Sequence, residues 1–240
     1  MLEHDYATMD RELRDLLGLS IPPIAITFGA QSPAGVHPFG GAQPAPTADG
    51  RTGPVTAGCV FWNHATEREF TTVAADHANC SVGSYTHGFK TLQEAAAGGD
   101  VQMLLQVEWV TMEAAMGLPT VAQKPEVVTY GPFGTTSVDP DVVFLRLNGK
   151  QMMLLNDALP DLRLEGKPQC HIIPIAKEQG EVVVSSGCML SRVRTGMSNN
   201  DVTCAIPASR ISDLLSRLKK AREADNKVAA YAAEDARRFA

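Results

Sequence analysis

The stretch "DVVFLRLNGKQMMLLNDAL", residues 141–159, decides the fold class. Residues 141–147 are a short apolar run that reads as a strand. Residues 151–159 read as a helix that follows the strand. A strand followed by a helix indicates layers of helix against sheet, so we expect a mixed sheet with flanking helices, of the α+β or α/β class.

Further strands are predicted on both sides of this unit. Short apolar runs after prolines or before turn residues are typical of buried strands. The strand before residue 141 is joined to it by a turn carrying Gly134 and Asp139-Pro140. The predicted strands lie at 22–28, 126–133, 170–176 and 181–187, the last two as a hairpin through "KEQG".

Helices are predicted where apolar residues recur at three- and four-residue steps. The final helix starts at Pro207 and presents Ile211, Leu214, Leu215 and Leu218 on one face. Residues 59–73 begin as a helix and end as a strand. The other predicted helices lie at 4–18, 91–99 and 101–117.

The chain is expected to form one domain over 1–221, with a helical tail over 222–240. A Gly- and Pro-rich stretch at 29–58 resists both helix and sheet, and it predicts a long irregular loop. A lid over a site and an untidy surface insertion remain alternative interpretations of this loop.

Composition excludes several classes of protein. The 240 residues are 44% hydrophobic and 20% charged, as in a globular protein. A net charge of −6 gives no basic surface for a nucleic acid, and no run approaches the roughly 18 apolar residues of a membrane span. The acidic N-terminus does not resemble a secretory signal, so we expect a cytoplasmic protein. We also expect its substrate to be a small molecule. Self-association into a homo-oligomer remains open.

The five cysteines carry the chemical hypothesis, because structural disulfides are rare in a reducing compartment. Cys59 and Cys188 each follow a glycine at an element boundary, and Cys80 occupies a comparable loop position. Such positions suit a metal or cluster site. No pair is spaced C-x-x-C, so the ligands would have to converge through the fold. Cys170 and Cys204 are left out of this predicted site.

Three cysteine ligands would leave one coordination position open, which favours catalysis over a purely structural role. His64, His77 and His87 are the nearest imidazoles, and we predict His64 and His87 as proton-handling catalytic residues. Arg192 is predicted to orient a substrate carboxylate, with Arg194 as a second candidate close by.

The order of elements resembles a known family. The matching segments are "LLGLSIPPIAITF", "GCVFWNHAT", "NCSVGSYTHGF", "VVTYGPF" with "DVVFLRLNGKQMMLLNDAL", and "SSGCMLSRVRTGMSNNDVTCAIPASRISDLLSRL". They are similar to the domain of unknown function 169 family of prokaryotic proteins, over about residues 6–219. The resemblance implies that the family's cysteine positions fall on Cys59, Cys80 and Cys188. It supplies no reaction.

The sequence therefore predicts a cytoplasmic enzyme of lyase or oxidoreductase type. Its Cys59, Cys80 and Cys188 would bind a metal group, expected to be a 4Fe-4S cluster with one iron open to a small molecule. Zinc, haem and no cofactor remain alternatives for the same residues. The competing functions are a non-catalytic small-molecule or tetrapyrrole-binding protein, and a metal-free enzyme that uses Cys80 with a histidine base.

Overall fold

A computed structural model of the chain describes residues 5–40 and 57–239. In these residues, seven strands form one mixed sheet in the order β2-β3-β1-β4-β7-β6-β5. All neighbours pair antiparallel except β5 and β6, which are parallel. The strands are β1 (Ile24–Gly29), β2 (Phe70–Thr72), β3 (Val127–Pro132), β4 (Val142–Leu147), β5 (Arg163–Glu165), β6 (Val183–Ser185) and β7 (Val202–Pro207).

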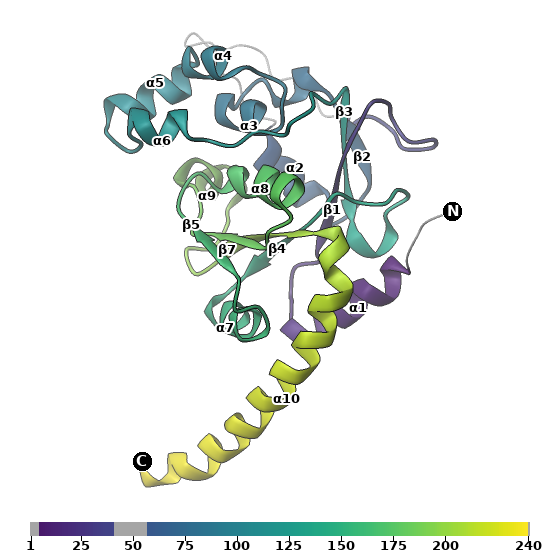
Figure 1. The fold of residues 1–240 in the computed structure, drawn as a ribbon, viewed down its shortest axis with the longest axis vertical. Helices are drawn as coiled ribbons and strands as arrows, with labels where there is room; N and C mark the ends of the chain where they lie inside the picture. Colours follow the sequence, from purple (N-terminus) through teal and green to yellow (C-terminus); the bar gives the residue numbers. More distant parts are fainter. Residues whose placement is uncertain (1–4, 41–56, 240) are drawn as a thin grey trace.

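Helices cover both faces of this sheet (Figure 1), which gives the α+β architecture predicted from the sequence. The longer helices are α1 (Tyr6–Leu17), α7 (Gly149–Ala158) and α10 (Ile211–Asp235). The shorter ones are α2 (Gly58–His64), α3 (Ser81–Thr86), α4 (Leu92–Ala96), α5 (Gly99–Gln106), α6 (Met112–Met116), α8 (Ile172–Gln179) and α9 (Met189–Thr195).

The alternation of side chains along the central strands creates two cores, because successive residues of a strand point to opposite faces. In β4, Val143, Leu145 and Leu147 join the core under α1, α7 and α10. Val142 and Phe144 of the same strand join the second core, which packs against α2 and α8. Both cores consist of side chains that are almost completely buried.

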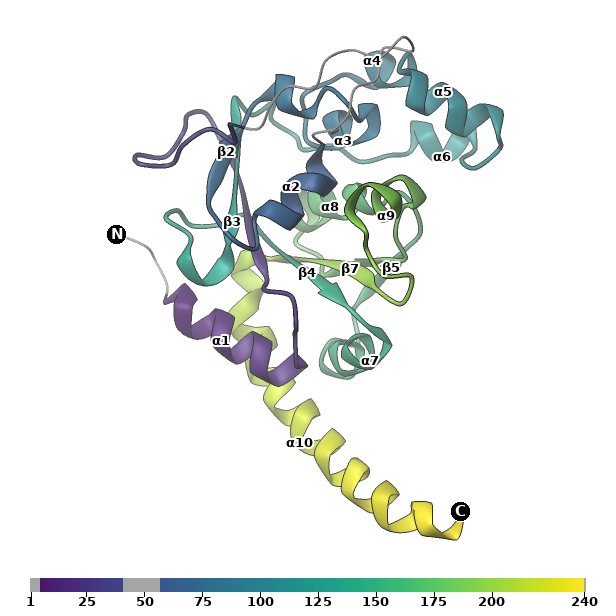
Figure 2. The ribbon, with the colours of Figure 1, turned by 180° about the vertical axis from the view of Figure 1, so that it is seen from behind.

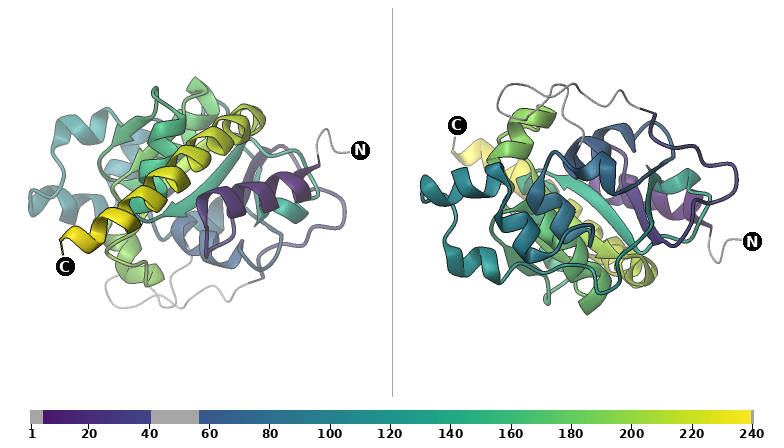
Figure 3. Two further views of the ribbon diagram at one scale, coloured as in Figure 1. Left: turned by 90° about the horizontal axis from the view of Figure 1, so that it is seen from below. Right: turned by 90° about the horizontal axis from the view of Figure 1, so that it is seen from above.

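The helices α3, α4, α5 and α6 form a separate layer, called here the cap, on the side of α2, α8 and α9 (Figure 2). Capping hydrogen bonds begin two of its helices: the hydroxyl of Thr91 accepts from Glu94 N–H, and the hydroxyl of Thr111 accepts from Ala114 N–H. The cap thus lies on the second core's side of the sheet. The first core's side is covered by α1, α7 and α10, with α1 and α10 side by side (Figure 3).

Two predicted elements differ from the structure. The single helix predicted over 101–117 is divided, since α5 ends at Gln106 and α6 begins at Met112. Residues 172–179 form the helix α8 instead of a strand of a hairpin, and only β6 of the predicted pair exists. Ile172, Ile173 and Ile175 are buried, and an apolar run buried on several sides has the same pattern in a helix as in a strand. Gly180, in the left-handed conformation, ends the helix at the point where the sequence predicted a turn.

Two other predictions are confirmed. Residues 59–73 begin as a helix, α2, and end as a strand, β2. The predicted amphipathic helix is α10, which continues through the predicted tail to Asp235. Within the Gly- and Pro-rich stretch, Phe39 is buried in the second core. The rest of that loop, residues 41–56, lies outside the described residues. Among the described residues, no helix has the length and apolar character needed to cross a membrane.

Candidate cysteine site

Four of the five cysteines line one small cavity between the cap and the sheet: Cys59, Cys80, Cys170 and Cys188. They come from four segments that are far apart in the chain. The fifth, Cys204, is fully buried in β7, where it belongs to the first core on the other face of the sheet. The structure therefore brings the three predicted cysteines together and adds Cys170, which the sequence analysis left out.

Each of these cysteines lies where a helix begins. Cys59 is the second residue of α2, and Cys80 and Cys188 are the residues that immediately precede α3 and α9. Cys170 belongs to a short 3-10 turn that leads directly into α8. The first N–H groups of a helix have no partner within the helix, so this position is favourable for a group that carries negative charge.

The glycine before Cys188 is required by its surroundings. Gly187 has φ +116°, and a Cβ there would lie 2.9 Å from Arg192 Nη2. At Gly58 a Cβ would make an ordinary contact, 3.4 Å from His87 Cε1. The two Gly-Cys segments also face each other, because Asn63 of α2 donates to the carbonyl oxygen of Thr195 at the end of α9. Gly-Cys thus marks two walls of one site.

Burial raises the pKa of the cysteine thiols. It raises the pKa of Cys59 to about 11, with the nearby Cys80 contributing further. The pKa of Cys170 is raised well above its ordinary value by burial and then by the charges of Cys80 and Cys188. These thiols lie close enough to repel one another as thiolates, so they ionise together only when positive charge is placed among them.

Arg194 supplies one positive charge at this cavity. It lines the cavity, and its side chain is hydrogen-bonded to Cys80. The pKa of Arg194 is raised overall, because Cys80 and Cys59 favour its charged form more than burial opposes it. The arginine thus balances one thiolate and leaves the remaining cysteines without a cationic partner from the protein among the described residues that line the cavity.

A second layer of polar groups lies behind Cys59. His77, His87 and Tyr130 are almost completely buried, and His77 Nδ1, His87 Nε2 and Tyr130 Oη have no hydrogen-bond partner in the described part of the chain. The two imidazole nitrogens point to one place, since a Cβ on Gly58 would lie 3.9 Å from the first and 3.7 Å from the second. Buried polar atoms without a partner are unusual, and they indicate a missing ligand, water or proton-transfer role.

The burial of His87 leads to a pH prediction. Burial lowers the pKa of His87 to about 4, against an ordinary value of 6.5. Between these values the unfolded chain binds the proton and the folded chain does not, so the free energy of unfolding falls as pH drops. We expect His87 to contribute a loss of about 1.4 kcal/mol per pH unit over that window. Urea unfolding at pH 7 and 4.5 measures this loss.

The matched variants are His87→Gln and His64→Gln. Glutamine cannot titrate, so the first variant should lose less stability on acidification than the parent protein does. His64 is exposed at the end of α2, so His64→Gln controls for the loss of one histidine outside the buried layer. Identical pH dependence in His87→Gln and the parent protein would contradict the prediction.

The other predicted catalytic residues lie away from the cavity. His64 is at the far end of α2, with its ring edge-on to Phe39 at a centroid distance of 5.1 Å. Arg192 donates to the backbone carbonyls of Ser186, Ser198 and Asp201, which occupies its guanidinium and fixes the loops around Cys188. Of the residues predicted as catalytic, His87 lies beside Gly58 and Arg192 beside Gly187, each next to a cysteine, but neither lines the cavity itself.

The sequence analysis missed Cys170 and Tyr130, and it named Arg194 only as a second candidate. Cys170 was placed on a strand of the wrong hairpin, where a thiol has no reason to face a site. Tyr130 sits in β3 among apolar residues, and its spacing is that of any core residue. Only Arg194 could have been found from the sequence, because it follows the Gly-Cys pair at 187–188 closely in the chain.

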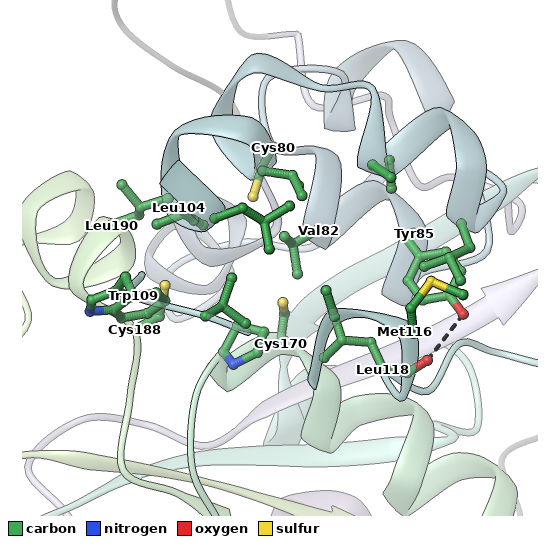
Figure 4. Close-up of a pocket in the computed structure, with 18 of the residues that line it drawn as sticks. Cys80, Val82, Tyr85, Leu104, Trp109, Met116, Leu118, Cys170, Cys188 and Leu190 are labelled. Atoms are coloured by element: carbon green, nitrogen blue, oxygen red, sulfur yellow. Dashed lines mark hydrogen bonds between the residues drawn. The ribbon is translucent and has the colours of Figure 1, made fainter. Parts of the chain in front are cut away.

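A larger, apolar cavity adjoins the cysteine cavity. It has a volume of about 60 Å³ and lies between the cap and the segment 168–190. Figure 4 shows Cys80, Cys170 and Cys188 at this cavity, with the sulfurs directed into the space between α3 and the loops of the sheet layer. The remaining wall is made of cap side chains, including Leu104, Trp109, Met116 and Leu118.

No group of three or more His, Cys, Asp or Glu side chains in the described residues is arranged to hold a single metal ion. A tetrahedral zinc site needs its thiolates within about 4 Å of each other, because each lies roughly 2.3 Å from the metal. A cluster of several irons separates its cysteine ligands more widely. The cysteines therefore offer soft sulfur ligands around a cavity, but they do not have the compact arrangement of a site for a single metal ion.

The chain is thus an α+β protein in which four cysteines, each near the first residue of a helix, line one cavity. A family model matches residues 12–217, and its description is "DUF169: Uncharacterised ArCR". The chain belongs to this family, as its sequence resemblance predicted. Searches of the curated proteins and of the solved structures found no match.

Proposed function

We propose that the chain is an iron–sulfur enzyme that binds a four-iron cluster at the cysteine cavity and acts on a small molecule there. The observation that carries this proposal is the convergence of Cys59, Cys80, Cys170 and Cys188 on one cavity. Thiolates are the usual ligands of such clusters, and clusters do not require C-x-x-C spacing when the fold brings the cysteines together.

Cys59, Cys80 and Cys188 are the proposed ligands, and Cys170 is the remaining thiol of the cavity. The apolar cavity adjoins this site and is lined by Cys80, Cys170 and Cys188. An enzyme needs space for a substrate beside its cluster, whereas a protein whose cluster only transfers electrons does not need such a space. With three cysteines as ligands, one iron of such a cluster would have no protein ligand.

The cluster would supply a Lewis acid or an electron carrier at this position. The protein's own residues have separate tasks. Arg194, hydrogen-bonded to Cys80, offsets the negative charge of the thiolates. His87, His77 and Tyr130 hold unpaired donors and acceptors behind Cys59, and they are the groups able to exchange protons with a ligand.

Burial raises the pKa of Cys59, Cys170 and Cys188, which disfavours these three thiols as nucleophiles of a metal-free enzyme, because a nucleophilic cysteine needs a lowered pKa. Cys80 stays the candidate nucleophile of that alternative. A bound metal group reverses the effect of burial by providing the positive charge that thiolates require. The tetrapyrrole alternative predicts a Soret band in the purified protein, so one absorption spectrum separates it from the cluster.

The test is anaerobic purification, or reconstitution with iron and sulfide, followed by an absorption spectrum and quantification of iron, zinc and acid-labile sulfide per chain. We expect broad absorption near roughly 400 nm with about four irons and four sulfides per chain. Protein that stays colourless and free of iron after reconstitution would overturn the proposal.

A further inference from the structure

The apolar cavity is partly open to the surface at α6, where its lining residues Met112 and Met116 are exposed. Empty apolar space of this kind is unusual, because side chains interdigitate at high density and leave few voids larger than a water molecule. This cavity has a volume of about 60 Å³, and no polar surface is exposed on its wall. An apolar cavity of this kind offers water no hydrogen bonds and is therefore poorly hydrated.

The lining of the cavity determines the chemistry of its occupant. Hydrocarbon gains free energy in proportion to the apolar area that it removes from water, whereas an ionised group would lose its hydration and find no partner here. The cavity therefore suits an alkyl group.

The two ends of the cavity differ. Cys80, Cys170 and Cys188 lie at one end (Figure 4). At the α6 wall, Met112 and Met116 line the cavity although they are 56% and 59% exposed. The helix α6 has no buried residue. It is thus the wall held least firmly by packing, and its methionines can adapt to occupants of different shape.

We infer that this cavity binds the uncharged alkyl portion of a small molecule, whose other end then meets Cys80, Cys170 and Cys188. The inference rests on the proposed function for the chemistry at the cysteine end, and it names the substrate class of that site. Binding itself requires only the cavity, so the two ideas can be tested apart.

The experiment is a titration of the full chain, labelled with ¹³C at the methionine methyl groups, with 1-butanol as the probe and butyrate as its charged counterpart. We expect 1-butanol to shift the signals of Met112 and Met116 saturably and to leave those of Met9 and Met153, in α1 and α7, in place. Butyrate should bind at least tenfold more weakly, because its carboxylate cannot be desolvated at the cavity wall.

Two alanines of α6 provide a matched pair of variants. Ala115 lines the cavity and Ala114, its neighbour, does not. Ala115→Phe should fill the space and weaken 1-butanol binding at least tenfold, whereas Ala114→Phe should bind it like the parent protein. Equal binding by both variants, or equal shifts at all methionines, would overturn the inference.

Iron content, measured on the same samples, separates the two proposals. Saturable 1-butanol binding without iron would retain the alkyl cavity and remove the cluster. Iron and sulfide in the expected amounts, with no shift at Met112 or Met116, would retain the cluster and remove the alkyl cavity.

Discussion

Replacing Cys59, Cys80 or Cys188 with alanine is expected to remove most of the iron and sulfide from the reconstituted protein. Each replacement deletes one of three sulfur ligands of the proposed cluster, and a cluster left with two is exposed to loss and hydrolysis. We expect at least a tenfold drop in iron per chain, with the absorption near roughly 400 nm falling in parallel. Iron analysis and circular dichroism on each variant measure the effect and check the fold.

Cys204 offers the matched control, because it is the one cysteine of the chain outside the cavity. It is buried in the first core, so Cys204→Ala removes a thiol without touching the site. This variant should keep the iron content of the parent protein. An equal loss of iron from Cys204→Ala would mean that iron follows the number of thiols or the stability of the fold, against the prediction.

Cys170→Ala decides the coordination of the fourth iron. The proposed open iron predicts that this variant keeps the iron and sulfide content of the parent protein. Loss of iron from Cys170→Ala to the same extent as from Cys80→Ala would make Cys170 a fourth ligand. The cluster would then be closed, which suits electron transfer and contradicts the proposed catalytic role.

The second large effect is expected at Trp62. Its side chain is 1% exposed in α2 and lies against Phe144 of β4, with ring centroids 4.3 Å apart. Replacement by alanine leaves a cavity under the helix that carries Cys59. We expect Trp62→Ala to lower the free energy of unfolding by about 3–5 kcal/mol, as is typical for a large buried aromatic side chain.

Trp109→Ala is the control for this prediction. Trp109 lies on the cap, is only half-buried, and has Lys167 Nζ 3.9 Å from its ring centre. The same change there should cost about 1 kcal/mol, because less apolar area is lost from a packed core. Urea unfolding followed by circular dichroism compares the two variants. A loss at Trp62 no larger than that at Trp109 would contradict the role of Trp62 as an anchor of α2.

Short-range pattern explains which parts of the fold the sequence predicts. The apolar run at 141–147 and the amphipathic spacing in 4–18 and from Pro207 to Leu218 are each visible over a few residues, and they correspond to β4, α1 and α10. The run at 170–176 is predicted wrongly, because α8 is buried on several sides and its isoleucines therefore show no helical period.

The candidate site follows the same division. Gly-Cys at 58–59 and 187–188 is visible in the sequence, because a glycine before a cysteine signals a close approach at an element boundary. Arg192 shows the opposite case. Its residue type suits a carboxylate, yet three backbone carbonyls occupy its guanidinium, and hydrogen bonding to loops distant in the chain cannot be read from spacing.

By itself the sequence determined the mixed helix and sheet, the family, and three of the four cysteines at the cavity, since each depends on local pattern or residue type. Only the tertiary structure decided that Cys170 joins them, that His87 and Tyr130 lie behind Cys59, and that an apolar cavity adjoins the site. The physical reason is that this site forms where the first residues of several helices meet the cap above the sheet. The contacts there join segments that are separated in the chain, and no local pattern in the sequence records such contacts.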